Sequence, residues 1–178
     1  MNQRRSFLKS SALLATALSV PAIGRAAATM SHERTLRLYN THTGETLRTV
    51  FWAEGQFVPD AMNDINKLLR DHRSNTIASM DPKLLVLLDE VSSQVGNGKV
   101  LHVISGYRSP ETNRRLAERS GGVAKHSMHL EGKAIDVRLP GYDLAKLHKA
   151  AMQAGGGGVG YYPNDQFVHM DTGRLRHW

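Results

Sequence analysis

The order of short apolar segments along the chain constrains its fold more than any other feature. Alternating polar and apolar residues over 36–52 flank Thr41-His42-Thr43-Gly44, a pattern typical of a β-hairpin. Further strands are expected at four short apolar runs: 100–105, 134–139, 159–162 and 167–171. Helical spacing of apolar residues, with start and stop signals, predicts four helices: 59–69, 82–95, 110–120 and 143–154. Helices interspersed with short strands indicate an α+β domain, in which helices pack on a small, mostly antiparallel sheet.

Length and composition allow one domain with an ordinary core. The chain has 178 residues, of which 40% are hydrophobic, so a disordered or fibrous protein is excluded. It has no cysteine. Disulfide bonds and thiolate metal sites are therefore excluded, and any metal would have to be held by histidine and carboxylate side chains.

The first 28 residues are typical of an export signal. A twin-arginine run, Arg4-Arg5-Ser6-Phe7-Leu8-Lys9, precedes a weakly apolar stretch over 11–23 and small residues that end at Ala28. The apolar stretch is well short of the roughly 20 residues that span a bilayer, so we expect no stable membrane anchor. We predict a twin-arginine signal peptide over 1–28, a single domain over 29–178, and delivery to the periplasm through the twin-arginine translocation machinery.

The charge of the mature chain is only mildly basic. The formal net charge is +7, and residues 1–28 contribute four basic residues and no acid, which leaves +3. A nucleic-acid-binding protein usually has a dense basic stripe, and the sequence shows none, so we expect no nucleic-acid partner. A modest positive charge suits an anionic polymer such as the bacterial cell wall.

A histidine and an aspartate are spaced as metal ligands could be. His129 precedes Asp136 by seven residues, and Gly132 between them allows a sharp turn of the backbone. Asp136 belongs to the expected strand 134–139, whose apolar residues point to the other side, so its carboxylate faces one side alone. Spacing alone leaves a second interpretation open, in which Asp136 is a turn or salt-bridge residue.

A second expected strand, 167–171, carries two more polar side chains. His169 and Asp171 alternate with apolar residues, so they share a face of this strand. If the two strands pair, His129, Asp136 and His169 converge. Two imidazoles and one carboxylate are a tetrahedral zinc set whose fourth position stays open for water, as in catalytic sites.

Three motifs in order extend these observations: Ser105-Gly106-Tyr107-Arg108-Ser109, then Ser127-x-His129-x-x-Gly132-x-Ala134-x-Asp136, then the strand Phe167-Val168-His169-Met170-Asp171. Together they resemble the D-Ala-D-Ala metallopeptidases, which belong to the wider lysostaphin-type, hedgehog-like zinc fold. The resemblance runs from about Leu36 to Trp178. Several separated motifs in the same order make it specific.

The resemblance implies roles for five residues. One zinc ion per chain would bind to His129, Asp136 and His169. Arg108 would orient the substrate or stabilise the oxyanion, and Ser127 would help to hold the peptide. These assignments are expectations that follow from the resemblance.

One position departs from the family. Many relatives carry an acidic residue three positions before the last zinc histidine, or a second histidine two positions before it. Here Gln166 and Phe167 occupy these positions, and neither accepts a proton usefully. Asp171 is then the candidate general base, although it could equally orient a zinc-bound histidine. Asp165 and a tyrosine, either of the adjacent pair Tyr161-Tyr162, are the next candidates for the base.

The resemblance implies a periplasmic zinc endopeptidase that hydrolyses cross-links between peptidoglycan stem peptides, in cell-wall growth or remodelling. Two alternatives remain. A D-Ala-D-Ala carboxypeptidase would use the same chemistry on a terminal D-alanine, and a zinc-stabilised wall-binding module would have no activity. The sequence favours neither a D,D nor an L,D linkage.

Overall fold

The computed structural model describes residues 33–178, except residue 97 and residues 120–125. The predicted signal peptide therefore lies outside the described residues. Within this part of the chain, no helix is both long and apolar enough to cross a membrane.

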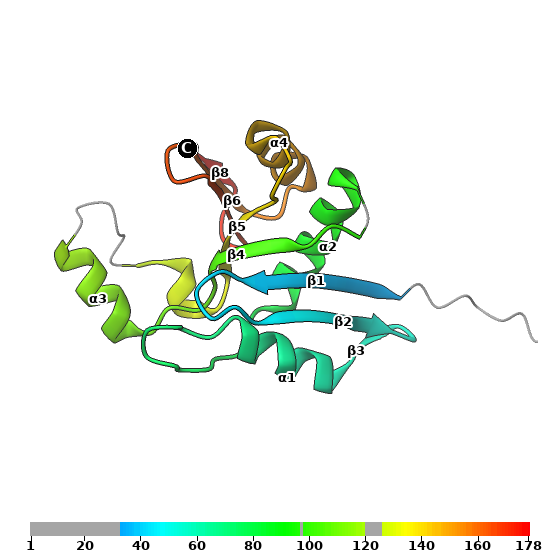
Figure 1. The fold of residues 1–178 in the computed structure, drawn as a ribbon, viewed down its shortest axis with the longest axis horizontal. Helices are drawn as coiled ribbons and strands as arrows, with labels where there is room; N and C mark the ends of the chain where they lie inside the picture. Colours follow the sequence, from blue (N-terminus) through cyan, green and yellow to red (C-terminus); the bar gives the residue numbers. More distant parts are fainter. Residues whose placement is uncertain (1–32, 97, 120–125) are drawn as a thin grey trace, which may run out of the picture. The chain divides into compact units, whose positions relative to one another are not determined.

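One eight-stranded sheet forms the centre of the domain (Figure 1). The strands are β1 (Arg34–Asn40), β2 (Thr46–Ala53), β3 (Gln56–Phe57), β4 (Leu101–Ser105), β5 (Ala134–Arg138), β6 (Gly158–Tyr162), β7 (Phe167–Asp171) and β8 (Arg176–His177). Their spatial order is β3-β2-β1-β4-β5-β7-β6-β8. Only the pairs β1–β4 and β6–β8 are parallel. The predicted α+β class with a mostly antiparallel sheet is thus confirmed.

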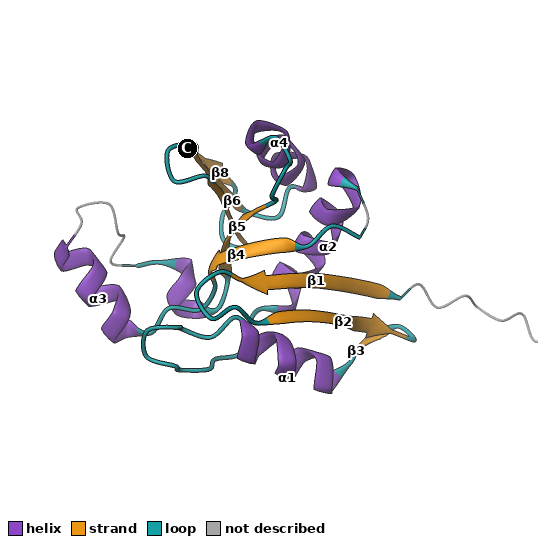
Figure 2. Cartoon of the chain, viewed as in Figure 1, coloured by secondary structure: helices purple, strands orange, loops and turns teal. Residues whose placement is uncertain are grey.

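Four α-helices and one 3-10 turn complete the described domain (Figure 2). They are α1 (Pro59–Leu68), α2 (Pro82–Val95), α3 (Pro110–Arg119), η1 (Met128–Glu131) and α4 (Leu144–Ala154). Helix α2 begins where predicted, because the Asp81 carboxylate accepts a hydrogen bond from the backbone N–H of Lys83 and Pro82 occupies the first turn. The Asp143 carboxylate caps α4 by accepting a hydrogen bond from the backbone N–H of Lys146.

The hydrophobic core lies between the sheet and three of the helices. Helices α1, α2 and α4 pack on the strands, whereas α3 lies apart from the sheet (Figure 2). In β5 and β7, the side chains that face the helices are fully buried: Ile135, Val137, Val168 and Met170. The alternate residues of the same two strands lie on the other face, as the period of two requires, and three of them are the polar residues Asp136, His169 and Asp171.

Three elements were not predicted: β3, β8 and η1. The two strands are two residues long, so they show no alternation in the sequence, and only their pairing with β2 and β6 defines them.

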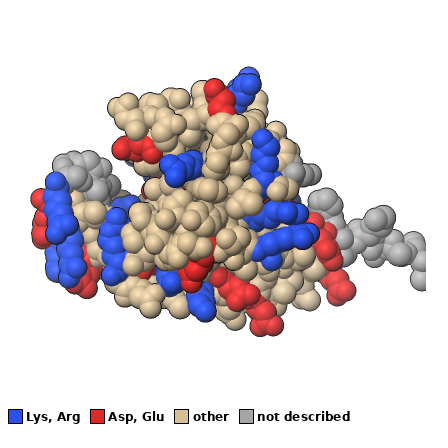
Figure 3. Space-filling view, in the orientation of Figure 1, with Lys and Arg blue, Asp and Glu red and all other residues tan. Residues whose placement is uncertain are grey.

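On the surface seen in Figure 3, basic and acidic side chains lie interspersed. On α3, for example, Arg114 pairs with Glu118 and Arg115 with Glu111.

Candidate metal centre

The turn that carries His129 is short and tightly determined. It is the 3-10 turn η1, and the Ser127 hydroxyl accepts a hydrogen bond from the His129 backbone N–H at 3.3 Å. Gly132 ends the turn with a φ of 65°, and a Cβ there would lie 2.4 Å from the Ser79 carbonyl oxygen. Only glycine fits that position, so the expected sharp turn is confirmed.

The pairing of β5 with β7 brings the other two polar residues together. The strands are antiparallel, with Asp136 opposite His169 and Ala134 opposite Asp171. The strand pairing on which the expected convergence depends is therefore present. Because Ala134 is small and fully buried, Asp171 can lie close to the β5 backbone.

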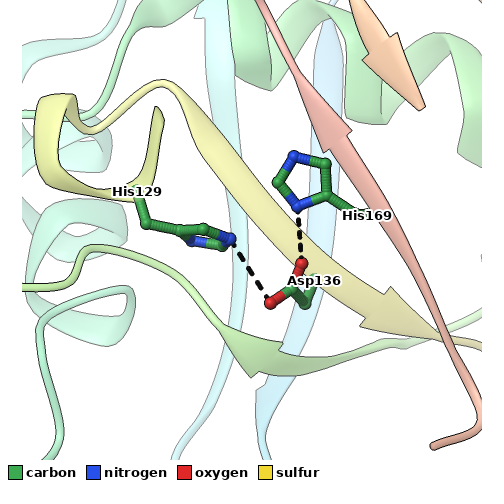
Figure 4. A group of neighbouring side chains, drawn as sticks. All are labelled: His129, Asp136 and His169. Carbon is green, nitrogen blue, oxygen red and sulfur yellow. Dashed lines mark hydrogen bonds and ion pairs between the residues drawn. The ribbon is translucent and has the colours of Figure 1, made fainter. Parts of the chain in front are cut away.

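The three side chains converge on one point (Figure 4). Asp136 lies between the two rings, with Oδ2 3.3 Å from His129 Nε2 and Oδ1 2.8 Å from His169 Nδ1. One ligand atom from each residue lies within 4.8 Å of the others. His129 Nδ1 donates to the Gly106 carbonyl oxygen at 2.7 Å, which leaves Nε2 free to face the centre. This donor set fits a zinc ion with an open fourth position.

Electrostatics keep the carboxylate ionised. Burial alone would raise the pKa of Asp136, but the charge of His129 and hydrogen bonds from His129 and His169 hold it well below its usual range. Burial would lower the pKa of His169, yet its hydrogen bonds to Asp136 and Asp171 outweigh burial and raise it. A buried carboxylate between two imidazoles supplies negative charge that offsets the cost of burying a divalent cation.

Asp171 lies behind His169. It is fully buried, and its Oδ2 is 3.1 Å from His169 Nε2, the ring nitrogen that does not face Asp136. It also accepts hydrogen bonds from the backbone N–H groups of Gly158 and Gly173, at 3.0 and 2.8 Å, and from Arg176 at 2.6 and 3.2 Å. The expected shared face with His169 is confirmed. These contacts favour an orienting role, and the role as general base stays a prediction.

Arg108 follows β4 in a loop that is fastened to the centre. Its backbone N–H donates to the His129 carbonyl oxygen at 3.1 Å, and the next N–H, of Ser109, donates to the buried Asp71 carboxylate at 2.9 Å. The guanidinium makes one long hydrogen bond, 3.4 Å to Asn113 Oδ1. Its Nε is buried without a hydrogen-bond partner in the described chain. Burial lowers the pKa of Arg108 and the nearby Asp136 carboxylate opposes this, but an arginine keeps its charge.

The remaining candidate residues do not all lie on the face of the sheet that carries His169. Tyr161 packs its ring against His148 of α4, 5.0 Å between centroids, so it faces the helix side. Tyr162 lies opposite Phe167, and the two rings stack at 4.5 Å on the face that carries His169. Asp165 is exposed in the turn between β6 and β7. The Ser127 hydroxyl holds η1, and its contact with substrate stays a prediction.

Sequence reasoning missed four residues at this site: Gly158, Gly160, Arg176 and Trp178. The two glycines belong to β6, which separates β8 from β7. Because they have no side chains, Arg176 reaches Asp171 and Trp178 reaches His169 across β6. The only local signal is the alternation Gly-Val-Gly over 158–160, which leaves one strand face bare.

Comparisons with known proteins agree with this geometry. Residues 28–178 match the peptidase M15_2 family model, whose description is "Peptidoglycan L,D-endopeptidase MepK". The chain is 39% identical over 175 residues to the protein of that name from Escherichia coli strain K12, covering 98% of this chain and 96% of the relative. It is 40% identical over 146 residues to "Probable peptidoglycan L,D-endopeptidase MepK" from Haemophilus influenzae, covering 82% of this chain and 78% of the relative.

Proposed function

The chain belongs to the peptidoglycan L,D-endopeptidase MepK family, and on that basis we propose that it is a zinc-dependent peptidase that cuts L,D cross-links between peptidoglycan stem peptides. The family match confirms the resemblance to the D-Ala-D-Ala metallopeptidases and, within them, to murein endopeptidase K. The choice of an L,D linkage rests on the names of the relatives.

The convergence of two histidines and one ionised aspartate is the observation that carries the proposal. His129 and His169 each have one ring nitrogen held by the protein and the other directed at Asp136, so His129, Asp136 and His169 would hold the ion. When bound, zinc supplies Lewis acidity toward the scissile carbonyl and makes a water molecule more acidic.

Arg108 supplies the second element of the chemistry. Its charge is close enough to the centre to be affected by Asp136, and its Nε is buried without a partner in the described residues. A buried N–H donor without an acceptor destabilises a protein unless a ligand accepts its hydrogen bond. We assign it to the substrate: it would bind a peptide carbonyl or carboxylate, and stabilise negative charge that develops on the scissile carbonyl oxygen.

The setting of the reaction follows from the leader. The arginine pair Arg4-Arg5 and the small residues before Ala28 support export by the twin-arginine machinery and action in the periplasm, where cross-links are cut during wall growth or remodelling. A twin-arginine substrate folds before export, which would allow the metal to be acquired inside the cell.

Digestion of purified murein tests the proposal. Murein is incubated with the zinc-loaded mature protein and with its Asp136→Ala variant, and the products are separated by chromatography. We expect cross-linked dimers to be converted to monomers by the wild type alone. Release of free D-alanine without loss of dimers would indicate a carboxypeptidase. Unchanged murein would indicate a binding module, and either result would refute the proposal.

A further inference from the structure

We propose that three aromatic side chains beside His169 form a substrate-binding wall, and that Trp178 is the residue of this wall that contacts the peptide. The aromatic wall consists of Tyr162, Phe167 and Trp178. The ligand chemistry is the alkyl part of an amino-acid side chain next to the scissile bond. This inference rests on the proposed function, because it concerns the substrate of the same centre.

The bare face of β6 makes the wall possible. Gly160 lies opposite His169 in the β6–β7 register, and a Cβ there would lie 2.7 Å from Cε2 of Trp178 and 2.8 Å from Cε2 of Tyr162. The indole therefore occupies the space of the missing side chain. From there its ring lies 5.4 Å from the His169 ring, between centroids. Trp178, which directly follows β8, thus reaches His169 of β7 across the intervening strand β6.

Three polar groups of Trp178 form hydrogen bonds within the protein. The indole Nε1 donates to the Tyr162 hydroxyl at 2.7 Å, the backbone N–H donates to the Val159 carbonyl at 3.2 Å, and its carbonyl accepts from Tyr161 at 3.0 Å. The Arg176 guanidinium lies 5.1 Å from the indole. The side chain is therefore held in one orientation even though 49% of the residue is exposed.

A fixed and exposed indole loses little further conformational entropy when a ligand binds to it. Tryptophan is common at binding hot spots. The charge of Arg176 is neutralised by Asp171, and the indole N–H is already donated. The ring faces of the wall are apolar, and they favour aliphatic groups over charged ones. Methyl groups and aliphatic chains of a cross-linked stem peptide meet that requirement. The Tyr162 hydroxyl, which accepts from the indole, keeps its own hydrogen available to donate at the edge of this surface.

Fluorescence and kinetics together test the wall. The chain has two tryptophans, so Trp52→Phe leaves Trp178 as the only indole. In this background the metal-free mature protein is titrated with a purified cross-linked muropeptide dimer, and separately with the disaccharide that lacks a peptide. We expect the emission of Trp178 to change with the dimer and not with the disaccharide. No change with the dimer, or an equal change with both, would overturn the proposal.

Kinetics with the zinc-loaded protein separate binding from metal retention. Trp178→Ala should raise KM for the dimer about ten-fold, the loss of roughly one good apolar contact, with zinc content and kcat close to wild type. Trp178→Phe should lie between the two. Gly160→Ala should displace the indole, so it should shift the emission before any ligand is added and raise KM as well. Trp52→Phe is the matched control and should leave KM unchanged.

Two results would contradict the role of Trp178. A wild-type KM in Trp178→Ala would overturn it directly, and loss of zinc from that variant would show that the indole supports the metal instead. The proposed function can fail separately: if the wild type cuts no dimer, the peptidase assignment is wrong, and the fluorescence titration still decides whether the peptide contacts Trp178.

Discussion

Replacing Asp171 by asparagine separates the two roles that the sequence left open. The carboxylate accepts five hydrogen bonds. Oδ1 accepts from the backbone N–H groups of Gly158 and Gly173 and from Arg176, and Oδ2 accepts from His169 and Arg176. An asparagine has one acceptor oxygen and an NH₂ group. In either orientation the NH₂ group opposes N–H donors, so at least two hydrogen bonds are lost and Arg176 loses its buried counter-charge.

We expect this change to lower the free energy of unfolding of the metal-free protein by about 3–5 kcal/mol, the usual cost of removing one partner of a buried ion pair. If Asp171 orients His169, zinc affinity should fall by about 10–100-fold, and excess zinc should restore much of the turnover. If Asp171 is the general base, turnover at saturating zinc should instead fall by about 10²–10⁴-fold. The contacts favour the first outcome.

Three measurements are needed: urea unfolding of the metal-free protein, zinc titration against a competing chelator, and turnover of a muropeptide dimer at saturating zinc. Asp64→Asn, a change at an exposed position of α1, is the matched control. An Asp171→Asn protein with wild-type stability, zinc affinity and turnover would refute both roles. The search for the base would then turn to Asp165 and Tyr162.

Three further predictions concern the metal, the acid stability and the export of the protein. The mature wild type should bind about one zinc ion, and His129→Ala or His169→Ala should abolish tight binding; equal zinc content by elemental analysis would remove the proposed site. The pKa of Asp71 is held far below its usual range, because hydrogen bonds to its carboxylate outweigh burial, which would raise the pKa. Its contribution to stability is therefore fully present above about pH 4 and is lost as the pH falls below that value. Asp71→Asn should lower the free energy of unfolding by about 2–3 kcal/mol at pH 7, measured in urea, and by less in strong acid. A difference from wild type that grows in acid would contradict this reasoning. Changing both Arg4 and Arg5 to lysine should leave precursor in the cytoplasm on cell fractionation, and normal periplasmic delivery would mean that the leader has another function.

Sequence periodicity was sufficient for most elements, and it placed the candidate metal ligands of the strands on polar faces, but the choice of the ligand set rested on the family resemblance. The period of two in β5 and β7 places Asp136 and His169 on polar faces, and Gly132 allows the turn that returns His129 to them. These features depend on neighbouring residues, so they can be recognised without knowing which strands are adjacent. The same local rules identified Asp171 as a residue on the His169 face.

The sequence by itself determined the helices, the main strands and the residues able to bind a metal, because period and capping are encoded locally. Only the tertiary structure decided what surrounds them. The partners of Asp171 come from Gly158, Gly173 and Arg176, which meet because β6 lies between β7 and β8. Strand order is set by long-range pairing and by the burial of a shared core, and no local pattern reports it. For that reason Trp178, the residue after a two-residue strand, became part of the site only once the sheet was assembled.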